Sequence, residues 1–216
     1  KIKYPIKNYK SMIGKVNGVI IAKDNWTDNK KIAEFFLKKK VPIFLDKPLT
    51  LSRTDLRFYK KFYDKKLLIS CSGLRFSKEL LEAKKKLKKI GKIKFVIGNI
   101  TNDLDKYGVH LLEAIQTLGI LNVKKMYKLK NNYKSYYLEL SGKKYLLLNC
   151  FGNKILINNL QIYCDRGYIN LNFNNNFFAF RRTLIEFVNL IKRNKVSFSF
   201  KDTFSIIDTI IKLKKL

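Results

Sequence analysis

The sequence has few of the residues that hold metals or form disulfides. Its 216 residues contain three cysteines, without a CxxC pair, and a single histidine. A zinc site of ordinary ligand spacing and a disulfide scaffold both need more such residues, so both are excluded and we expect no bound metal. Cys71, Cys150 and Cys164 each lie within an apolar stretch, and we expect reduced, buried thiols in a cytoplasmic protein.

Long apolar runs are also missing. No stretch approaches the roughly 18 apolar residues of a membrane-spanning helix, and no signal-peptide core follows the basic start. Apolar residues nevertheless make up 46% of the chain and aromatic residues 13%, which is enough for a sizeable core. The composition therefore excludes a disordered tail and a collagen, and we expect no membrane partner.

Acidic residues are scarce, with 16 Asp and Glu against 46 Lys and Arg, so the formal net charge is +30. Taken alone, this excess suggests a partner rich in phosphate. Only seven of the basic residues are Arg, the side chain that dominates bidentate phosphate and base recognition. The lysines are spread along the polar sides of amphipathic helices, and Lys, Asn, Ile, Phe and Tyr are together the residues of AT-rich codons. The composition therefore does not favour a nucleic-acid-binding protein. Binding to random DNA with a steep dependence on salt concentration would support that alternative.

Short apolar runs alternate with amphipathic helices in the first part of the chain. The runs, which are typical of parallel strands buried on both faces, are residues 18–22, 41–45 and 67–71. One helix begins at Asp28 or Asn29 and a second extends from Ser52 to about Lys65. With a third helix over residues 77–89, this pattern predicts a βαβαβ unit, the parallel half of an α/β sheet.

The second part of the chain is richer in strands. A strand over residues 92–99 and a helix over residues 107–118 come first. The strand patterns that follow, joined in part by hairpin turns at Ser141-Gly142 and Gly152-Asn153, are residues 122–129, 134–140, 144–150, 154–157 and 167–173. Two helices close the chain, the first with an apolar stripe of Phe180, Leu184, Phe187, Val188 and Ile191. The fold class is thus α/β plus α+β, with a parallel sheet followed by a mostly antiparallel sheet with flanking helices.

The junction Asp46-Lys47-Pro48 carries the clearest chemical signal. It follows a predicted parallel strand, and open α/β sheets bind ligands at the carboxyl ends of their strands. Proline fixes the turn and would hold the Lys47 amine over this crevice. The alternative is a helix-entry turn with a solvated lysine.

Four segments in order, residues 18–22, 41–49, 72–76 and 107–113, resemble the Gfo/Idh/MocA oxidoreductases, the relatives of glucose–fructose oxidoreductase and inositol dehydrogenase. In that family an EKP or DKP motif ends a strand of the nucleotide-binding domain, and a GxH motif begins a helix of the second domain. The resemblance extends from about residue 17 to the end. It implies a Rossmann-like domain over residues 1–91 and an α+β substrate and oligomerisation domain over residues 92–216. The last helices of the second domain would pack back on the first domain.

The resemblance implies hydride transfer between NAD or NADP and a hydroxyl carbon of a sugar or sugar-like substrate. Lys47 would lie near both nicotinamide and substrate, and His110 would be the general acid and base. The alternative for His110 is a buried histidine that packs beside Tyr107. The resemblance implies that the cofactor is bound by Ala22, Asp24, Asn25, Asp46, Lys47 and Pro48. The alternative for the first three is a simple polar loop.

For the substrate, the resemblance implies contacts with Arg75, Asp105 and Tyr107, whereas Arg75 could instead be a surface residue that caps a helix. Many members of the family carry an Asp four residues before the motif histidine. This sequence has Lys106 there, and Asp105 is one place away. A non-catalytic relative that acts as an oligomeric binding module is therefore a second reading.

The sequence lacks the Gly-rich turn with which the family begins, because none of its ten glycines forms a GxG. The resemblance implies that the first βαβα portion, on the order of 60 residues, is absent from the Rossmann-like sheet. We therefore expect residues 18–22 to form an exposed sheet edge and the chain alone to bind NAD(P) poorly. We also expect homo-oligomers through the second sheet, with the rows Tyr136, Leu138, Leu140 and Tyr145, Leu147, unless these rows cover helices of the same subunit.

Overall fold

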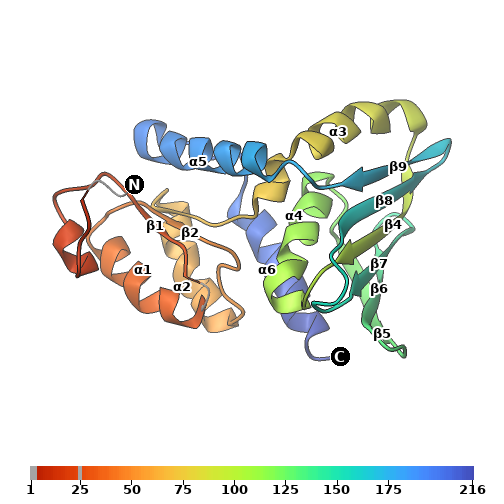
Figure 1. Cartoon of the computed structure of the whole chain (residues 1–216), viewed down its shortest axis with the longest axis horizontal. Helices are drawn as coiled ribbons and strands as arrows, with labels where there is room; N and C mark the ends of the chain where they lie inside the picture. Colours follow the sequence, from red (N-terminus) through yellow and green to blue (C-terminus); the bar gives the residue numbers. More distant parts are fainter. Residues whose placement is uncertain (1–3, 24–25) are drawn as a thin grey trace.

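One parallel and one mixed β-sheet organise the chain (Figure 1). The structure is a computed structural model that describes residues 4–23 and 26–216, so the predictions for Asp24 and Asn25 lie outside the described residues. In this part of the chain the parallel sheet has the order β1-β2-β3 and the mixed sheet the order β5-β6-β7-β4-β8-β9. The predicted fold class is confirmed.

The parallel sheet contains β1 (Val19–Ile21), β2 (Ile43–Leu45) and β3 (Leu68–Ile69), linked by the helices α1 (Asn29–Lys38) and α2 (Arg53–Asp64). The predicted βαβαβ unit is thus present, with shorter strands. Ser52 caps α2, because its hydroxyl accepts a hydrogen bond from the Asp55 N–H at 3.3 Å. All three residues of β2 are buried, as a central parallel strand covered on both faces requires. Among the described residues β1 is an edge strand, and its Ile20 is 47% exposed.

The mixed sheet is antiparallel at every pairing except that of β4 with β7. Its strands are β4 (Ile93–Ile100), β5 (Val123–Leu129), β6 (Lys134–Leu140), β7 (Lys144–Cys150), β8 (Asn158–Cys164) and β9 (Gly167–Asn172). One face carries the buried side chains, and the helices α4 (Val109–Thr117) and α6 (Phe200–Leu213) pack against it (Figure 1). No helix in the described part of the chain covers the other face.

The prediction of a strand at residues 154–157 after a hairpin at Gly152-Asn153 is wrong. Residues 151–157 cross the end of β4, which lies between β7 and β8, and the strand begins only at Asn158. Asn158 and Asn159 have low strand propensity, which concealed the start of β8 in the sequence. The alternation of buried Leu160 and Ile162 with Gln161 is nevertheless the period of a half-covered strand.

Two hydrophobic cores share the C-terminal helices. Ile206 and Ile210 of α6 belong to the core of the mixed sheet, whereas Ile207 and Ile211 of the same helix belong to the core of the parallel sheet. The helix α5 (Asn176–Arg193) adds Phe187 to the core of the parallel sheet. The helix α6 therefore joins the two sheets, and the domain boundary at residue 91 stays a prediction.

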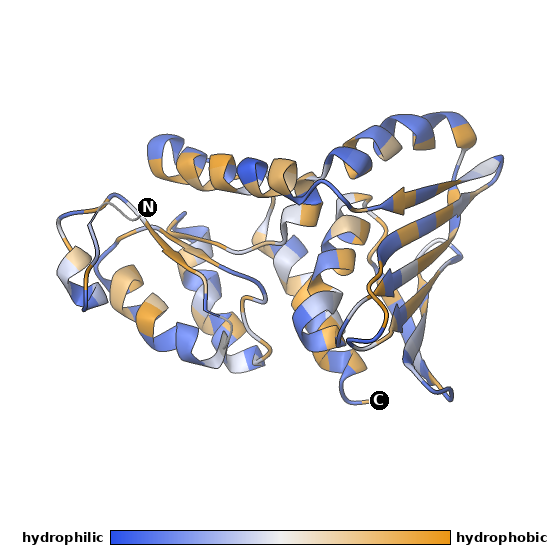
Figure 2. Cartoon of the chain, in the orientation of Figure 1, coloured by the Kyte–Doolittle hydropathy of each residue, from blue (hydrophilic) through white to orange (hydrophobic). Residues whose placement is uncertain are grey.

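The predicted apolar stripe of α5 is largely wrong. Phe180, Leu184 and Val188 are 63%, 45% and 45% exposed, and the helix instead buries Ala179, Thr183, Glu186, Phe187 and Leu190. Small residues face inward because the backbone of the short turn Gly73–Phe76 approaches α5 closely, next to Ala179. At the other end, a Cβ on Gly18 would lie 2.5 Å from Ile191 Cδ1, so a larger residue there would require this side chain of α5 to shift. Figure 2 shows the resulting hydrophobic colour along α5.

The helices of the described residues are too short or too polar to cross a membrane. The cysteines form no disulfide, and Cys71 and Cys150 are buried as expected, whereas Cys164 is half-buried. The described His, Cys, Asp and Glu side chains form no group of three that could hold a metal ion.

Candidate active site

Lys47 lies at the carboxyl end of β2, where the chain turns away from the parallel sheet. The Asp46 N–H donates to the Ile21 carbonyl at 2.9 Å and thereby fixes the start of this turn against β1. The Lys47–Pro48 peptide is cis. The Lys47 ammonium donates to the Lys106 carbonyl at 3.4 Å and lies 5.3 Å from the centre of the Tyr107 ring. The turn after β2 therefore contacts the segment that leads into α4.

His110 lies in the first turn of α4, which follows a π-helical turn over Leu104–Gly108. The glycine of the GxH motif allows the Leu104 side chain to pack closely against the backbone, because a Cβ on Gly108 would lie 2.6 Å from Leu104 Cδ1. The His110 ring lies 5.5 Å from the Tyr107 ring, edge to face. Its Nδ1 is 2.6 Å from the Ser72 hydroxyl, which also accepts a hydrogen bond from the Leu74 N–H at 3.1 Å.

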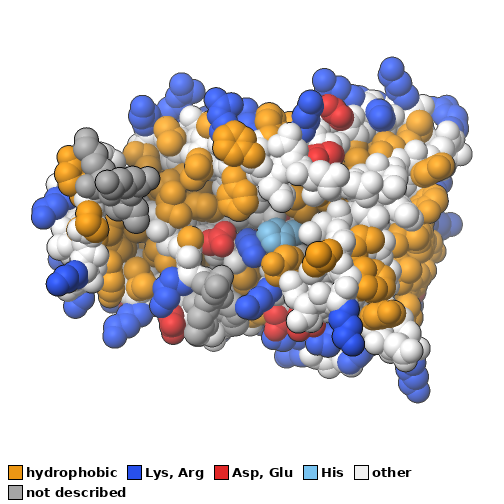
Figure 3. Space-filling model, in the orientation of Figure 1, with side chains coloured by type: hydrophobic (Ala, Val, Ile, Leu, Met, Phe, Trp, Pro, Cys, Tyr) orange, Lys and Arg blue, Asp and Glu red, His pale blue; other side chains and the backbone are white. Residues whose placement is uncertain are grey.

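A cavity of about 340 Å³ joins the carboxyl end of the parallel sheet to the start of α4. Asp46, Lys47, Tyr107 and His110 line it together. An adjoining hollow of about 300 Å³ shares the first three of these residues and also contains Pro48. Figure 3 shows the single histidine, in pale blue, beside acidic and basic side chains near the middle of this face. Five predicted site residues from two distant parts of the sequence thus come together.

The cavity keeps His110 neutral. Burial, together with the smaller effect of the nearby Lys47 ammonium, lowers the pKa of His110 to about 3. With Nδ1 at the Ser72 hydroxyl, the remaining ring nitrogen, Nε2, is the one that can exchange a proton with a ligand. A neutral imidazole near a fixed ammonium group is an arrangement that can take a proton from a hydroxyl while the ammonium stabilises the oxygen.

Arg75 does not line this cavity, and because it is buried the alternative of a surface residue is wrong, whereas its contact with a substrate stays a prediction. Its guanidinium is buried against Glu113, with Nε and Nη2 at 2.6 Å and 2.5 Å from Glu113 Oε2, and it lies 4.6 Å from the centre of the Phe198 ring. Burial raises the pKa of Glu113, whereas Arg75 and the Ser72 N–H oppose that rise. Arg75 points away from the cavity because the carboxylate that compensates its charge comes from α4, a contact that sequence separation conceals.

Two other predicted site residues also lie outside the cavity. The Asp105 carboxylate accepts from the Lys214 ammonium at 2.5 Å and is not among the residues around the cavity. Ala22 is exposed just after β1 and lines neither the cavity nor the hollow. Lys106, which stands where the family has an Asp, lines the hollow.

Several residues in or next to the cavity escaped the sequence analysis. Ser72 does not line the cavity but contacts His110, and its position after the third parallel strand, at the sheet edge where ligands bind, was a usable signal. Asn158 was hidden by the misplaced strand, and Asn176 and Thr183 by the wrong choice of the buried face of α5.

The residues around the cavity fit part of a nicotinamide cofactor. The hollow next to Lys47 is polar, with the ammonium of Lys23 and the amide of Asn102, and such groups suit a ribose and a carboxamide. No GxG turn stands at the start of a described helix to provide N–H groups for a pyrophosphate. The chain thus offers groups for the nicotinamide end and none of this kind for the pyrophosphate.

No family model and no curated protein sequence matches this chain. Solved structures do match its fold. The scyllo-inositol dehydrogenase of Lactobacillus casei has a TM-score of 0.80 at 15% identity, over 97% of this chain and 80% of the other. The UDP-N-acetylglucosamine 3-dehydrogenase of Acidithiobacillus ferrooxidans has 0.79 at 10% identity, over 98% and 82%. The biliverdin reductase of Synechocystis, with biliverdin and NADP⁺, has 0.77 at 13% identity, over 98% and 83%. The fold that the Gfo/Idh/MocA resemblance implied is therefore confirmed.

Proposed function

We propose that this protein is an oxidoreductase that transfers a hydride between a nicotinamide cofactor and a hydroxyl carbon of a sugar-like substrate. The observation that carries the proposal is the shared cavity of Lys47, from the end of β2, and His110, from the start of α4. The dehydrogenase and reductase folds that the chain resembles support it.

In this proposal His110 is the general base of alcohol oxidation. Its Nε2 takes the proton of the substrate hydroxyl while the Ser72 hydroxyl holds Nδ1 in place. The Lys47 ammonium stabilises the negative charge that develops on the substrate oxygen. A bound nicotinamide would supply the hydride acceptor, so that the hydroxyl carbon loses a hydride and becomes a carbonyl carbon. Asp46 and Tyr107 line the cavity together with Lys47 and would orient the substrate.

The polar hollow beside Lys47 is the proposed place of the nicotinamide end, with Asp46, Pro48 and Asn102 around it. The cavity next to His110 would then hold the substrate. A polyol suits it, because the ammonium, imidazole and amide groups of Lys47, His110 and Asn158 can each bind a hydroxyl.

The experiment is an assay of hydride transfer with inositols and sugars, or their ketones, in which the absorbance of the reduced nicotinamide is followed. We expect the substitutions Lys47→Met and His110→Gln to lower turnover by roughly 10²–10⁴-fold while the circular dichroism spectrum stays unchanged. Lys124→Met, on the exposed part of β5, is the matched control and should leave turnover unchanged. Normal turnover in both site variants would refute the assignment. Absence of turnover in every substrate, at cofactor concentrations high enough to overcome the weak binding expected of this chain, would favour a non-catalytic relative.

We also propose that the uncovered face of the mixed sheet pairs with a second copy of the chain. A row of aromatic side chains crosses all six strands on this face, namely Tyr127, Tyr137, Tyr145, Phe95, Tyr163 and Tyr168. Tyr168 is 69% exposed, and exposed aromatic rows are typical of protein interfaces. The other expected row is buried in its own subunit, because Tyr136, Leu138 and Leu140 face the helices.

A further inference from the structure

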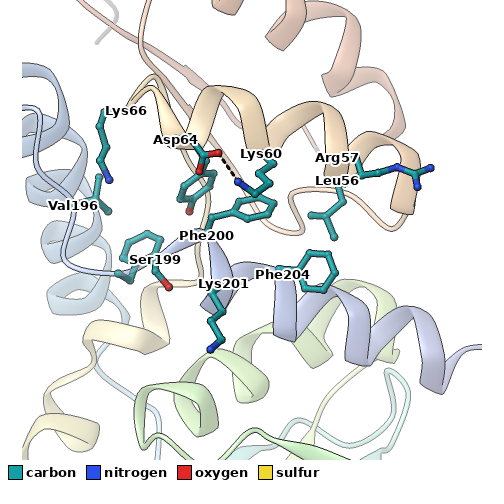
Figure 4. Close-up of a pocket in the computed structure, with 12 residues that line it drawn as sticks. Leu56, Arg57, Lys60, Asp64, Lys66, Val196, Ser199, Phe200, Lys201 and Phe204 are labelled. Atoms are coloured by element: carbon teal, nitrogen blue, oxygen red, sulfur yellow. Dashed lines mark hydrogen bonds and ion pairs between the residues drawn. The ribbon is translucent and has the colours of Figure 1, made fainter.

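A second cavity, of about 510 Å³, lies between α2 and the chain that leads into α6 (Figure 4). Its apolar walls are Leu56 and Tyr63 of α2, Val196 and Phe198 of the connecting segment, and Phe200 and Phe204 of α6. None of its described residues lines the cavity that contains His110. We refer to it as the α2/α6 cavity.

Aromatic rings form one side of the α2/α6 cavity. The Phe200 ring lies 5.2 Å from the Tyr63 ring and 6.2 Å from the Phe204 ring. Phe204 is 42% exposed, although it sits in a concavity between two helices. Concave sites with exposed aromatic faces bind flat apolar groups, since such groups stack on the rings and displace water.

The rim of the α2/α6 cavity is basic. Its charged residues are Arg57, Lys60, Lys66, Lys201 and a single acid, Asp64. The Asp64 carboxylate is 2.5 Å from the Lys60 ammonium, which also lies 5.9 Å from the centre of the Phe200 ring (Figure 4). After this ion pair, the rim retains an excess of positive charge next to an apolar wall.

The hollow beside Lys47 also carries more basic than acidic groups among its described residues, but Tyr107 is the single aromatic one, so an excess of lysine alone does not produce a site of this kind. The neighbouring hollow between α4 and α6 is also lined by two lysines, Lys201 and Lys212, but Asp202 and Asp208 balance them. A hollow along the helix α3 (Lys78–Ile90) and β9 even has more acidic than basic groups, with Glu79 and Glu82 against Lys86. The combination of aromatic walls and unbalanced positive charge therefore distinguishes the α2/α6 cavity.

We propose that the α2/α6 cavity is a binding site for a small aromatic carboxylate. The apolar ring of the ligand would lie against Phe200 and Phe204, and its carboxylate would face the ammonium groups of Lys60 and Lys201. The volume is that of a site for a small molecule, since such sites have roughly 300–1,000 Å³. A charge-assisted hydrogen bond next to an apolar wall is the contact that separates an anion from a neutral molecule of the same shape.

Isothermal titration of the 216-residue chain with three ligands of equal shape tests the proposal: 2-naphthylacetate, 2-naphthylethanol and 2-naphthylethylamine. We expect the carboxylate to bind about tenfold or more tightly than the alcohol, and the amine to bind most weakly. Equal binding of the three, or no binding of the carboxylate, would overturn the proposal. Binding of an acidic, Phe-containing peptide in place of the carboxylate would overturn it in favour of a protein partner.

Variants locate the site. Phe204→Ala and Lys201→Gln alter side chains on the surface, so the fold should persist, and each should weaken the carboxylate by about tenfold. Asp64→Asn removes the only acid of the rim and should tighten binding several-fold. Leu156→Ala and Lys128→Gln, both exposed and elsewhere, are the controls. Equal affinity in the Phe204→Ala and Leu156→Ala variants would show that the ligand binds outside this cavity.

Discussion

The Ser72 hydroxyl lies 2.6 Å from Nδ1 of His110. Ser72 follows the third parallel strand, whereas His110 belongs to a helix 38 residues later in the chain, so the contact joins the parallel-sheet unit to α4. The same serine accepts from the Leu74 N–H, which holds its oxygen in place beside Nδ1. In the tautomer with the proton on Nδ1, Nε2 has a free lone pair, as a general base requires.

Replacement of Ser72 by Ala should therefore lower the turnover of the proposed hydride transfer by roughly tenfold, because His110 loses the hydroxyl that holds its Nδ1 in place. Ser77→Ala is a matched control: Ser77 is equally buried at 1% and caps a helix in the same way, by accepting from Leu80, but it does not contact His110. Both variants should lose about 1 kcal/mol of stability. If turnover falls equally in the two, the effect of Ser72 is only structural.

The pKa of His110 predicts how stability depends on pH. The folded protein keeps this side chain neutral down to about pH 3, whereas the unfolded chain protonates it near pH 6.5. Below that value the unfolded state binds the extra proton, so folding stability falls as the pH falls. Relative to a His110→Gln variant, the wild type should lose up to about 1.4 kcal/mol per pH unit between about pH 6 and pH 4.

Urea unfolding at several pH values measures this difference. Contributions of other groups, including Glu113, cancel when the two curves are subtracted, and the chain has no second histidine. A difference that is constant with pH would mean that the folded protein protonates His110, and the assignment of a neutral base would be wrong.

The local pattern of the sequence was sufficient for the parallel unit, whereas the pair of Lys47 and His110 followed from the resemblance to the Gfo/Idh/MocA oxidoreductases. Continuous apolar runs, the serine cap of α2 and the turn after β2 are all determined by neighbouring residues, and the structure contains them. The GxH motif was informative for the same reason, because Gly108 packs on Leu104 within a single turn.

Contacts between distant segments were not predictable from the sequence. Arg75 turns away from the cavity because Glu113 compensates its charge, and α5 buries small residues because the turn at Gly73 approaches it closely. Likewise, the insertion of β4 between β7 and β8 depends on the order of strands in space, which no local pattern encodes.

The buried pair of Arg75 and Glu113 should be costly to break. Glu113→Gln or Arg75→Met leaves a buried group without its partner, and each should destabilise the protein by about 3–5 kcal/mol. The more exposed pair of Arg53 and Asp208 is the control, and Arg53→Met should cost less than about 1 kcal/mol. Urea unfolding gives both values. If Arg75→Met instead left stability unchanged and raised only the KM, Arg75 would be a substrate contact.

The absence of a GxG turn predicts an unusual cofactor preference for the 216-residue chain. NADH and reduced nicotinamide mononucleotide share the nicotinamide end, and NADH adds the pyrophosphate and adenosine. Because the chain offers no glycine turn for the pyrophosphate, NADH should bind weakly, well above micromolar dissociation constants, and only about as well as the mononucleotide. Nicotinamide fluorescence measures both affinities. Micromolar binding of NADH by the chain itself would contradict the prediction.

The aromatic row predicts the oligomeric state. Tyr145 and Tyr168 are 36% and 69% exposed, so their replacement by Lys removes little from the core of the subunit. If the uncovered sheet face pairs two copies, Tyr145→Lys with Tyr168→Lys places charges within the interface, where each unpaired charge costs several kcal/mol. Light scattering should then show a dimer for the wild type and a monomer for the double variant, with the same unfolding temperature in dilute solution. Leu156→Lys, at a residue 87% exposed and outside the row, should stay dimeric. A monomeric wild type at about 100 μM would exclude this face as a stable interface, since interfaces of standard size hold dimers together at such concentrations.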